Sequence, residues 1–129
     1  MIDETTVAIL IKKAREAQQH AYAPYSHFSV GAAVLTEDNR MYTGCNVESA
    51  SYGLTMCAER NAIGSAVAGG CHMFRALALV GENPDWITPC GACRQVMEEF
   101  HIPEIILTKS NDTYKIVSLR ELLPHAFSL

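Results

Sequence analysis

The sequence lacks any run of basic residues, and its acidic side chains outnumber the basic ones. Asp and Glu number 14 against 10 Lys and Arg, which gives a formal net charge of −4. Affinity for nucleic acid rests mainly on contacts of Lys and Arg with phosphates. We therefore expect no nucleic-acid partner.

A long apolar stretch is also lacking. No segment approaches the roughly 20 apolar residues that cross a bilayer, and residues 1–6 carry neither the basic nor the apolar region of a signal peptide. We expect no membrane insertion and no secretion, and we place the protein in the cytoplasm. Five cysteines in such a chain favour metal binding or free thiols over disulfides.

Internal repeats, low-complexity segments and linkers are absent as well. The chain has 129 residues, of which 49% are hydrophobic, so it is long enough to bury a core. We expect a single domain over residues 1–129.

Hydrophobic periodicity predicts alternating strands and helices. Asp3 is expected to cap a first helix that continues until Pro24 ends it. Thr55 is expected to cap a second helix, and a third begins around Cys90. Strands are expected at residues 28–35, 41–45, 76–80, 105–107 and 114–117, and a short last helix at residues 119–123.

The order of these elements predicts an α/β fold. The first two strands form a hairpin, and residues 41–107 predict a largely parallel central portion with right-handed crossovers. Small residues leave a shallow face at Gly31 and Ala33, which a helix can approach closely. Ligands bind at the carboxyl edge of such sheets, and the second and third helices both begin there.

Two short motifs carry the candidate chemistry. Residues 55–63 contain Cys57 and Glu59, and residues 89–95 contain Cys90 and Cys93. A structural zinc ion normally has four protein ligands, whereas a catalytic one has three and keeps a position for water. Three thiols beside a carboxylate therefore favour a catalytic zinc site.

The spacing of these residues favours a metal between two helix N-termini. Cys90 and Cys93 are three residues apart and share a helix face. Cys57 and Glu59 are about 200° apart on a helix, so they converge only on a point beyond its end. Helix N-termini stabilise thiolates, and Arg60 can donate hydrogen bonds to the sulfurs. Glu59 would take up and deliver the protons of the reaction.

The C-x-E and P-C-x-x-C pair matches the zinc deaminase signature with Cys in place of His. With the segment N-V-E-S-A-S-Y at residues 46–52, these motifs resemble the small cytidine deaminases of pyrimidine salvage, over residues 23–127. The resemblance implies a three-layer α/β/α sandwich with a five-stranded mixed sheet and one Zn²⁺ per chain. It also implies hydrolysis of cytidine or 2′-deoxycytidine to uridine or 2′-deoxyuridine with release of ammonia.

The resemblance also assigns substrate-binding roles. Asn46 and Glu48 would bind the ribose hydroxyls, and Phe28 would stack on the pyrimidine. Ala58 would offer backbone groups to the base. We expect these roles because the residues occupy positions that match the pattern of the family.

A homotetramer with shared active sites is a further implication of the resemblance. Tyr52 and Phe127 match residues that the family lends to the site of a neighbouring subunit. The last residues, 122–129, are apolar where most domains fray, so they need cover. A partner subunit is the expected source of that cover.

Three alternatives stay open at this point. A deaminase of another small aminopyrimidine nucleoside, such as a nucleoside antibiotic, would keep the zinc motifs without needing Asn46 and Glu48. A polynucleotide-editing deaminase would need a basic groove. A non-catalytic zinc-binding module would need a fourth ligand from Cys45 or Cys71, although both positions are more typical of packing thiols. Arg94 either contacts the sulfurs or lies exposed.

Overall fold

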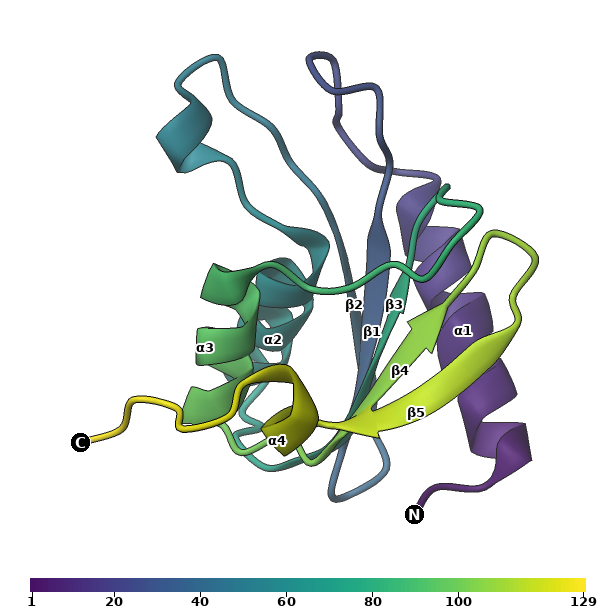
Figure 1. The fold of residues 1–129 in the computed structure, drawn as a ribbon, viewed down its shortest axis with the longest axis vertical. Coiled ribbons are helices and arrows are strands. Elements are labelled where there is room, and N and C mark those ends of the chain that lie inside the picture. Colours follow the sequence, from purple (N-terminus) through teal and green to yellow (C-terminus); the bar gives the residue numbers. More distant parts are fainter.

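The structure, a computed structural model, describes all 129 residues and is built around a five-stranded mixed sheet of order β2-β1-β3-β4-β5. Helix α1 covers one face of the sheet, while α2 and α3 cover the other, with α4 beside α3 (Figure 1). This arrangement is the predicted three-layer α/β/α sandwich. The elements are α1 Glu4–Gln18, β1 Gly31–Thr36, β2 Met41–Cys45, η1 Tyr52–Leu54, α2 Ala58–Ala68, β3 Phe74–Val80, α3 Gly91–Glu99, β4 Glu104–Thr108, β5 Tyr114–Ser118 and α4 Leu119–Leu122.

The predicted parallel centre of the sheet is wrong in one respect. Strand β1 lies between β2 and β3 and pairs antiparallel with both, so β3 and β4 form the one parallel pair. Every residue of β1 is buried, which suits a central position rather than an edge. Strands β2 and β3 nevertheless run in the same direction, because each is antiparallel to β1. The helices that follow them, α2 and α3, therefore begin at the same edge of the sheet.

The close approach of the helices to the sheet depends on two glycines. A Cβ atom on Gly31 would collide with the carbonyl oxygen of Ala14 in α1. On the other face, a Cβ on Gly44 would collide with the backbone nitrogen of Ala62 in α2. Only glycine permits backbones to approach so closely. The shallow face expected at Gly31 is thus confirmed.

Two buried clusters fill the space between the layers. The smaller cluster joins α1 to one face of the sheet, and the larger joins α2 and α3 to the other. Leu10 in the smaller cluster and Leu77 in the larger one are both fully buried.

No helix of the structure combines the length and the apolar character needed to cross a bilayer.

The predicted start of α1 is confirmed, but its predicted end is wrong. The Asp3 carboxylate accepts a hydrogen bond of 2.8 Å from the Thr6 N–H, as a cap should. The helix ends at Gln18, well before Pro24. The chain leaves the helix because Tyr22 pairs with the loop that follows β2: its N–H donates to the carbonyl oxygen of Asn46.

Two other predicted boundaries are corrected by side-chain hydrogen bonds. Strand β1 begins at Gly31 rather than at Phe28, because the side chain of Asn46 bonds the backbone of the preceding residues. Helix α2 is capped by Cys57 rather than by Thr55, whose hydroxyl instead accepts from the Ser49 N–H.

Candidate metal centre and active site

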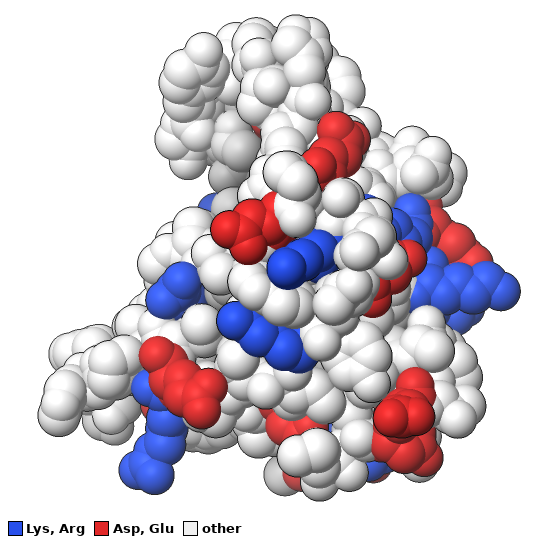
Figure 2. Space-filling view, turned by 45° about the vertical axis from the view of Figure 1, so that its right-hand side comes forward, with Lys and Arg blue, Asp and Glu red and all other residues white.

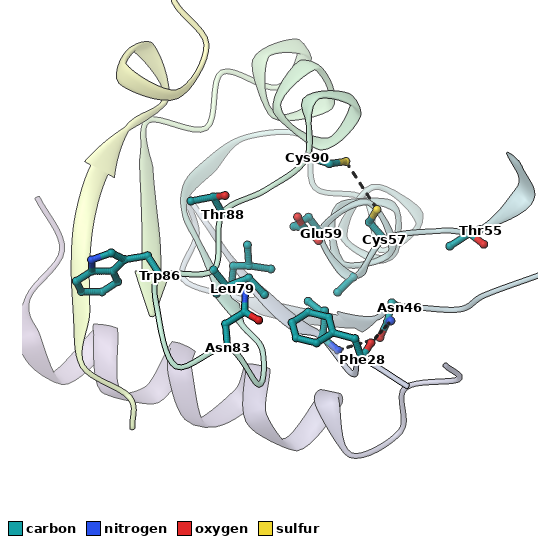
Figure 3. Close-up of a pocket in the computed structure, with 13 residues that line it drawn as sticks. Phe28, Asn46, Thr55, Cys57, Glu59, Leu79, Asn83, Trp86, Thr88 and Cys90 are labelled. Atoms are coloured by element: carbon teal, nitrogen blue, oxygen red, sulfur yellow. Dashed lines mark hydrogen bonds between the residues drawn. The ribbon is translucent and has the colours of Figure 1, made fainter. Parts of the chain in front are cut away.

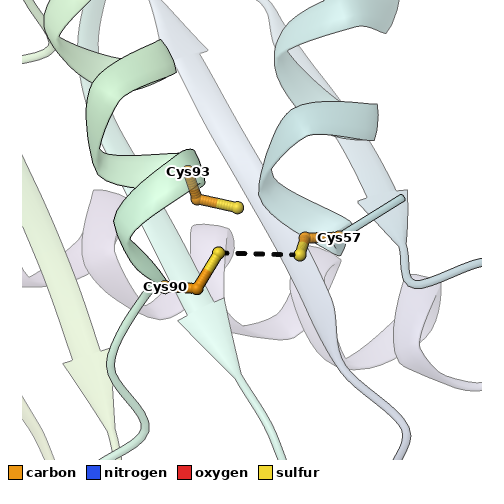
Figure 4. Close-up of side chains that lie close together, drawn as sticks. All are labelled: Cys57, Cys90 and Cys93. Atoms are coloured by element: carbon orange, nitrogen blue, oxygen red, sulfur yellow. Dashed lines mark hydrogen bonds between the residues drawn. The ribbon is translucent and has the colours of Figure 1, made fainter. Parts of the chain in front are cut away.

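Three cysteines meet where α2 and α3 begin. Cys57 is the N-cap of α2, Cys90 is the N-cap of α3, and Cys93 lies in the first turn of α3. Their sulfurs all lie within 4.8 Å of one another, and those of Cys57 and Cys90 are 3.9 Å apart (Figure 4). Zinc–sulfur bonds of about 2.3 Å place the corners of a tetrahedron roughly 3.8 Å apart. The cluster therefore has the dimensions of a three-thiolate zinc site.

The other two cysteines lie outside this cluster. Cys71 is buried beneath Arg40, whose guanidinium donates to its sulfur. Cys45 ends β2, and partial burial raises the pKa of its thiol. Neither belongs to the group of possible ligands, so the protein supplies three thiols and leaves one corner of the tetrahedron open.

The surroundings of the cluster favour thiolate. The hydrogen bond from the Cys93 thiol lowers the pKa of Cys57 to about 5, against the opposing effect of burial, and a hydrogen bond from Arg60 adds to this lowering. The Arg60 Nη2 lies 3.4 Å from the Cys57 sulfur, whereas its Nε is buried without a partner. The pKa of Cys93 is raised, because its thiol donates to Cys57 and is buried. The positive charge of Arg60 beside the Cys57 sulfur stabilises thiolate, the form of cysteine that binds metal ions.

Glu59 lies next to the cluster, in the first turn of α2. Its side chain is buried, with the residue 4% exposed, and it borders the same cavity as Cys57 and Cys90 (Figure 3). Burial raises its pKa to about 7, and the neighbouring Cys57 thiolate adds to this effect. A carboxyl group that gains and loses a proton near neutral pH is suited to general acid–base catalysis.

The cavity beside these groups has a volume of about 300 Å³, at the small end of ligand-binding pockets. It brings together residues from the segment before β1, the segment between β2 and α2, the first turn of α2, β3 and the loop between β3 and α3 (Figure 3). Its lining is formed by Phe28, Val30, Asn46, Thr55, Cys57, Ala58, Glu59, Leu79, Asn83, Trp86, Ile87, Thr88 and Cys90. Of the residues expected from the sequence, Phe28, Asn46 and Ala58 thus share one cavity with Glu59.

Hydrogen bonds from neighbouring side chains fix the backbone of the segment that carries the Phe28 ring. The side-chain amide of Asn46 donates to the Phe28 carbonyl oxygen at 2.8 Å, and its oxygen accepts from the Val30 N–H at 2.9 Å. The Phe28 N–H donates to the hydroxyl of Ser26, which in turn donates to the carboxylate of Glu48. Asn46 and Glu48 therefore fix the segment that presents the Phe28 ring to the cavity.

Glu48 and Tyr52 lie in a neighbouring hollow rather than in the cavity itself. The Glu48 carboxylate also accepts from the N–H groups of Tyr25 and Ser26, at 3.0 and 3.1 Å. Its pKa is lowered, chiefly by the hydrogen bond from the Ser26 hydroxyl. Thr55 lines both spaces, so the hollow is a lateral extension of the cavity.

Phe127 lies on the C-terminal segment, away from the cavity of its own chain. Its side chain is 69% exposed, and the C-terminal segment runs along α3, where Gln95 donates to the Phe127 carbonyl oxygen. Figure 1 shows this segment projecting from the body of the protein beyond α4. Within one chain, Phe127 does not line the cavity.

The β3–α3 loop contributes one wall of the cavity, with residues to which the sequence assigns no role. Asn83, Ile87 and Thr88 line the cavity, and Trp86 borders it. These residues follow no periodic pattern, and their one available signal is that the loop leads directly into Cys90. Arg94 does not contact the sulfurs: it donates to the carbonyl oxygens of Pro89 and Leu122.

Known proteins are similar to this chain in sequence and in fold. The family model described as "Cytidine and deoxycytidylate deaminase zinc-binding region" matches residues 5–109. The chain belongs to this family. A cytidine deaminase of Sporosarcina psychrophila is 45% identical over 122 residues, which cover 92% of this chain and 89% of that protein.

Solved structures of cytidine deaminases have the same fold. The protein from Burkholderia pseudomallei is 48% identical with a TM-score of 0.89, over 98% of this chain and 100% of that chain. The protein from Mycobacterium tuberculosis is 42% identical with a TM-score of 0.82, over 95% of this chain and 97% of that chain. Membership of a zinc-binding deaminase family accounts for the cluster of Cys57, Cys90 and Cys93, which is built to hold a metal ion.

The cluster leads to a prediction about metal content. Cys90→Ala should leave two thiols, too few for a stable zinc site, so the purified variant should contain far less than one zinc per chain by elemental analysis. Cys71→Ala removes a thiol outside the cluster and serves as the matched control, which should keep its zinc. Equal zinc in both variants would contradict the assignment.

Proposed function

We propose that this protein hydrolyses free cytidine and 2′-deoxycytidine to uridine and 2′-deoxyuridine with release of ammonia, as an enzyme of pyrimidine salvage. The observation that carries this proposal is the joint placement of Glu59 and the cysteine cluster at one cavity. The names of the relatives, which are cytidine deaminases, support the choice of substrate. A cytoplasmic location is part of the proposal, and five unpaired cysteines agree with a reducing compartment.

The proposed binding mode follows from the lining of the cavity. The Phe28 ring stacks on the pyrimidine, and the backbone of Ala58 at the start of α2 offers hydrogen bonds to the base. Asn46 and Glu48 bind the ribose hydroxyls at the side where the cavity continues into the neighbouring hollow. A neutral sugar suits this side, because the Glu48 carboxylate can accept hydrogen bonds from hydroxyl groups.

The proposed proton transfers belong to Glu59. Zinc held by Cys57, Cys90 and Cys93 would supply the Lewis acidity that brings the pKa of water toward about 7. Glu59 accepts a proton from the attacking water while the water oxygen bonds to C4 of the pyrimidine, and it delivers that proton to ring N3. It then moves the proton of the new hydroxyl group to the amino group, so that the C4–N bond breaks and ammonia leaves. A carboxyl pKa of about 7 permits both directions of transfer.

The substrate class can be tested directly. Figure 2 shows acidic and basic side chains interspersed over the displayed face, rather than gathered into a basic groove for a phosphate backbone. A phosphate on the sugar would also be repelled by Glu48. Incubation with cytidine should therefore shift the ultraviolet spectrum toward that of uridine, whereas cytidine monophosphate and single-stranded DNA should remain unchanged. Comparable turnover of the monophosphate would refute this choice of substrate.

Replacement of the proton shuttle gives a second test. Glu59→Gln keeps the shape of the side chain but removes its ability to transfer protons, so kcat should fall by at least roughly 10²–10⁴-fold. Zinc content should stay near that of the wild type, since Glu59 is not one of the three thiol ligands. Glu16→Gln changes an exposed carboxylate of α1 and should leave kcat as it is. Wild-type turnover in Glu59→Gln would remove the role assigned to this carboxyl.

A homotetramer with shared active sites is a further part of the proposal. Tyr52 is 75% exposed, Leu54 71% and Phe127 69%, so several large apolar side chains face solvent in a single chain. They lie on η1 and the C-terminal segment, which both project from the body (Figure 1). Projecting apolar segments are typical of surfaces that subunits cover. We place Tyr52 and Phe127 at the cavity of a neighbouring subunit.

Complementation tests this sharing. Glu59→Ala subunits lack the proton shuttle, and Phe127→Ala subunits lack the donated ring, so each homo-oligomer should be weakly active. In a mixed oligomer, a Phe127→Ala subunit keeps Glu59 and receives Phe127 from its neighbour. Co-refolding should then raise activity above the sum of the separate samples. Mixed oligomers without such a gain would show that Phe127 is not donated across the interface.

A further inference from the structure

Arg15 joins three separate parts of the chain although it does not line the cavity. It lies on α1, with its side chain 23% exposed. Its guanidinium donates to the Asp112 carboxylate at 2.8 Å and to the Gly81 carbonyl oxygen at 2.7 Å. A longer hydrogen bond of 3.2 Å runs from the guanidinium to the carbonyl oxygen of Lys109. The side-chain oxygen of Gln18 also accepts from the guanidinium, at 2.9 Å.

These acceptors engage all three nitrogens of the Arg15 guanidinium. The group is therefore already committed to the protein rather than available to an anionic ligand. Gly81 is the first residue of the β3–α3 loop, and Lys109 and Asp112 belong to the turn between β4 and β5. Figure 1 shows these two loops beside the C-terminal half of α1. Arg15 thus holds both loops against the same helix.

The β3–α3 loop is further attached to the last residue of β4 and to the turn that follows this strand. The Ile87 N–H donates to the Thr108 carbonyl oxygen at 3.0 Å, and the Ser110 N–H donates to the Asn83 carbonyl oxygen at 2.9 Å. Asn83 and Ile87 both line the cavity. A displacement of the turn would therefore be transmitted through Asn83 to this wall of the cavity.

Trp86 strengthens the same connection. The ammonium groups of Lys109 and Lys115 lie 4.8 and 4.6 Å from the centre of its ring, within the range of cation–π attraction. In Figure 3 the ring points away from Cys57 and Glu59. Trp86 thus anchors the loop from outside.

The other end of the loop is held independently. Arg94 donates to the Pro89 carbonyl oxygen at 2.8 Å and to the Leu122 carbonyl oxygen at 2.6 Å. These bonds fix the residue immediately before Cys90. Loosening of the loop at Gly81 would therefore move Asn83 and Ile87 without displacing the cysteine cluster.

We infer that Arg15 is a positioning residue for substrate binding, which sets the Asn83–Ile87 wall of the cavity by holding Gly81 and the β4–β5 turn against α1. The inference rests on the proposed function, because the substrate is the nucleoside that this cavity accepts. Arg15 affects binding and leaves the metal centre unaltered. Its replacement raises KM and leaves kcat unchanged. This pattern is expected when a change weakens the binding of the substrate and of the transition state equally.

The test uses the zinc-loaded, full-length protein with Arg15→Met, which keeps the aliphatic part of the side chain and removes every donor. For cytidine, KM should rise by roughly 3- to 30-fold, with kcat within about twofold of the wild type and zinc content unchanged. The chain contains one tryptophan, so fluorescence reports on Trp86 alone. Quenching by acrylamide should increase in Arg15→Met without any substrate present.

Arg40→Met is the matched control. Arg40 also bonds a carboxylate and a backbone carbonyl, those of Asp38 and Gly69, but at the opposite edge of the sheet. Its loss should leave KM and Trp86 quenching unchanged. Arg15→Lys keeps part of the hydrogen bonding and should fall between the wild type and Arg15→Met in both measurements.

The outcomes separate the two claims. If the wild type does not convert cytidine, the proposed function fails, while the quenching comparison still decides whether Arg15 holds the loop. Unchanged quenching in Arg15→Met, or equal increases in Arg15→Met and Arg40→Met, would overturn the inference, as would an equal loss in kcat and kcat/KM at constant KM. Should Arg15→Met not fold, Asp112→Asn removes one charged partner of Arg15, and it must show a smaller change in the same direction.

Discussion

Helices α2 and α3 begin side by side at one edge of the sheet, and this arrangement determines where the other groups of the site can lie. Cys57 and Cys90 are the N-cap residues of α2 and α3, but neither thiol accepts a capping hydrogen bond from its own helix, and both face the space between the helices (Figure 4). The helix dipoles favour the negative charge of thiolates at this point. Glu59 is in the first turn of α2, and it reaches the same space only because the cluster lies beyond the end of the helix.

Three arginines form hydrogen bonds that hold the segments around the cysteine cluster and the cavity. Arg60 contacts the cluster itself, Arg94 fixes the start of α3 through Pro89, and Arg15 holds the loop that forms the opposite wall of the cavity. Each forms hydrogen bonds to a different loop or side chain, so the metal centre and the binding wall are supported separately.

The sequence predicted the centre of the site better than its rim, for physical reasons. Metal ligands and a proton shuttle need particular residue types at particular spacings, and both are visible in residues 57–60 and 89–93. The wall at residues 81–88 has no periodicity, since its shape is set by hydrogen bonds to the β4–β5 turn and to Arg15, which is far away in the chain. The hairpin of β1 with β2 is predicted correctly, but the position of β1 between β2 and β3 is not, because alternating elements predict which strands exist but not which ones are neighbours. Side-chain bonds from Asn46 and Thr55 moved the ends of β1 and α2 in ways that local propensity does not reveal.

We expect an open three-thiolate metal site between the two helices. X-ray absorption at the zinc edge of the substrate-free protein would count its ligands, because sulfur and oxygen ligands lie at different distances from zinc. The spectrum should show three sulfur atoms at about 2.3 Å and one oxygen or nitrogen atom at about 2.0 Å from zinc. Four sulfur atoms would mean that Cys45 or Cys71 closes the site, and would contradict the assignment of a catalytic centre.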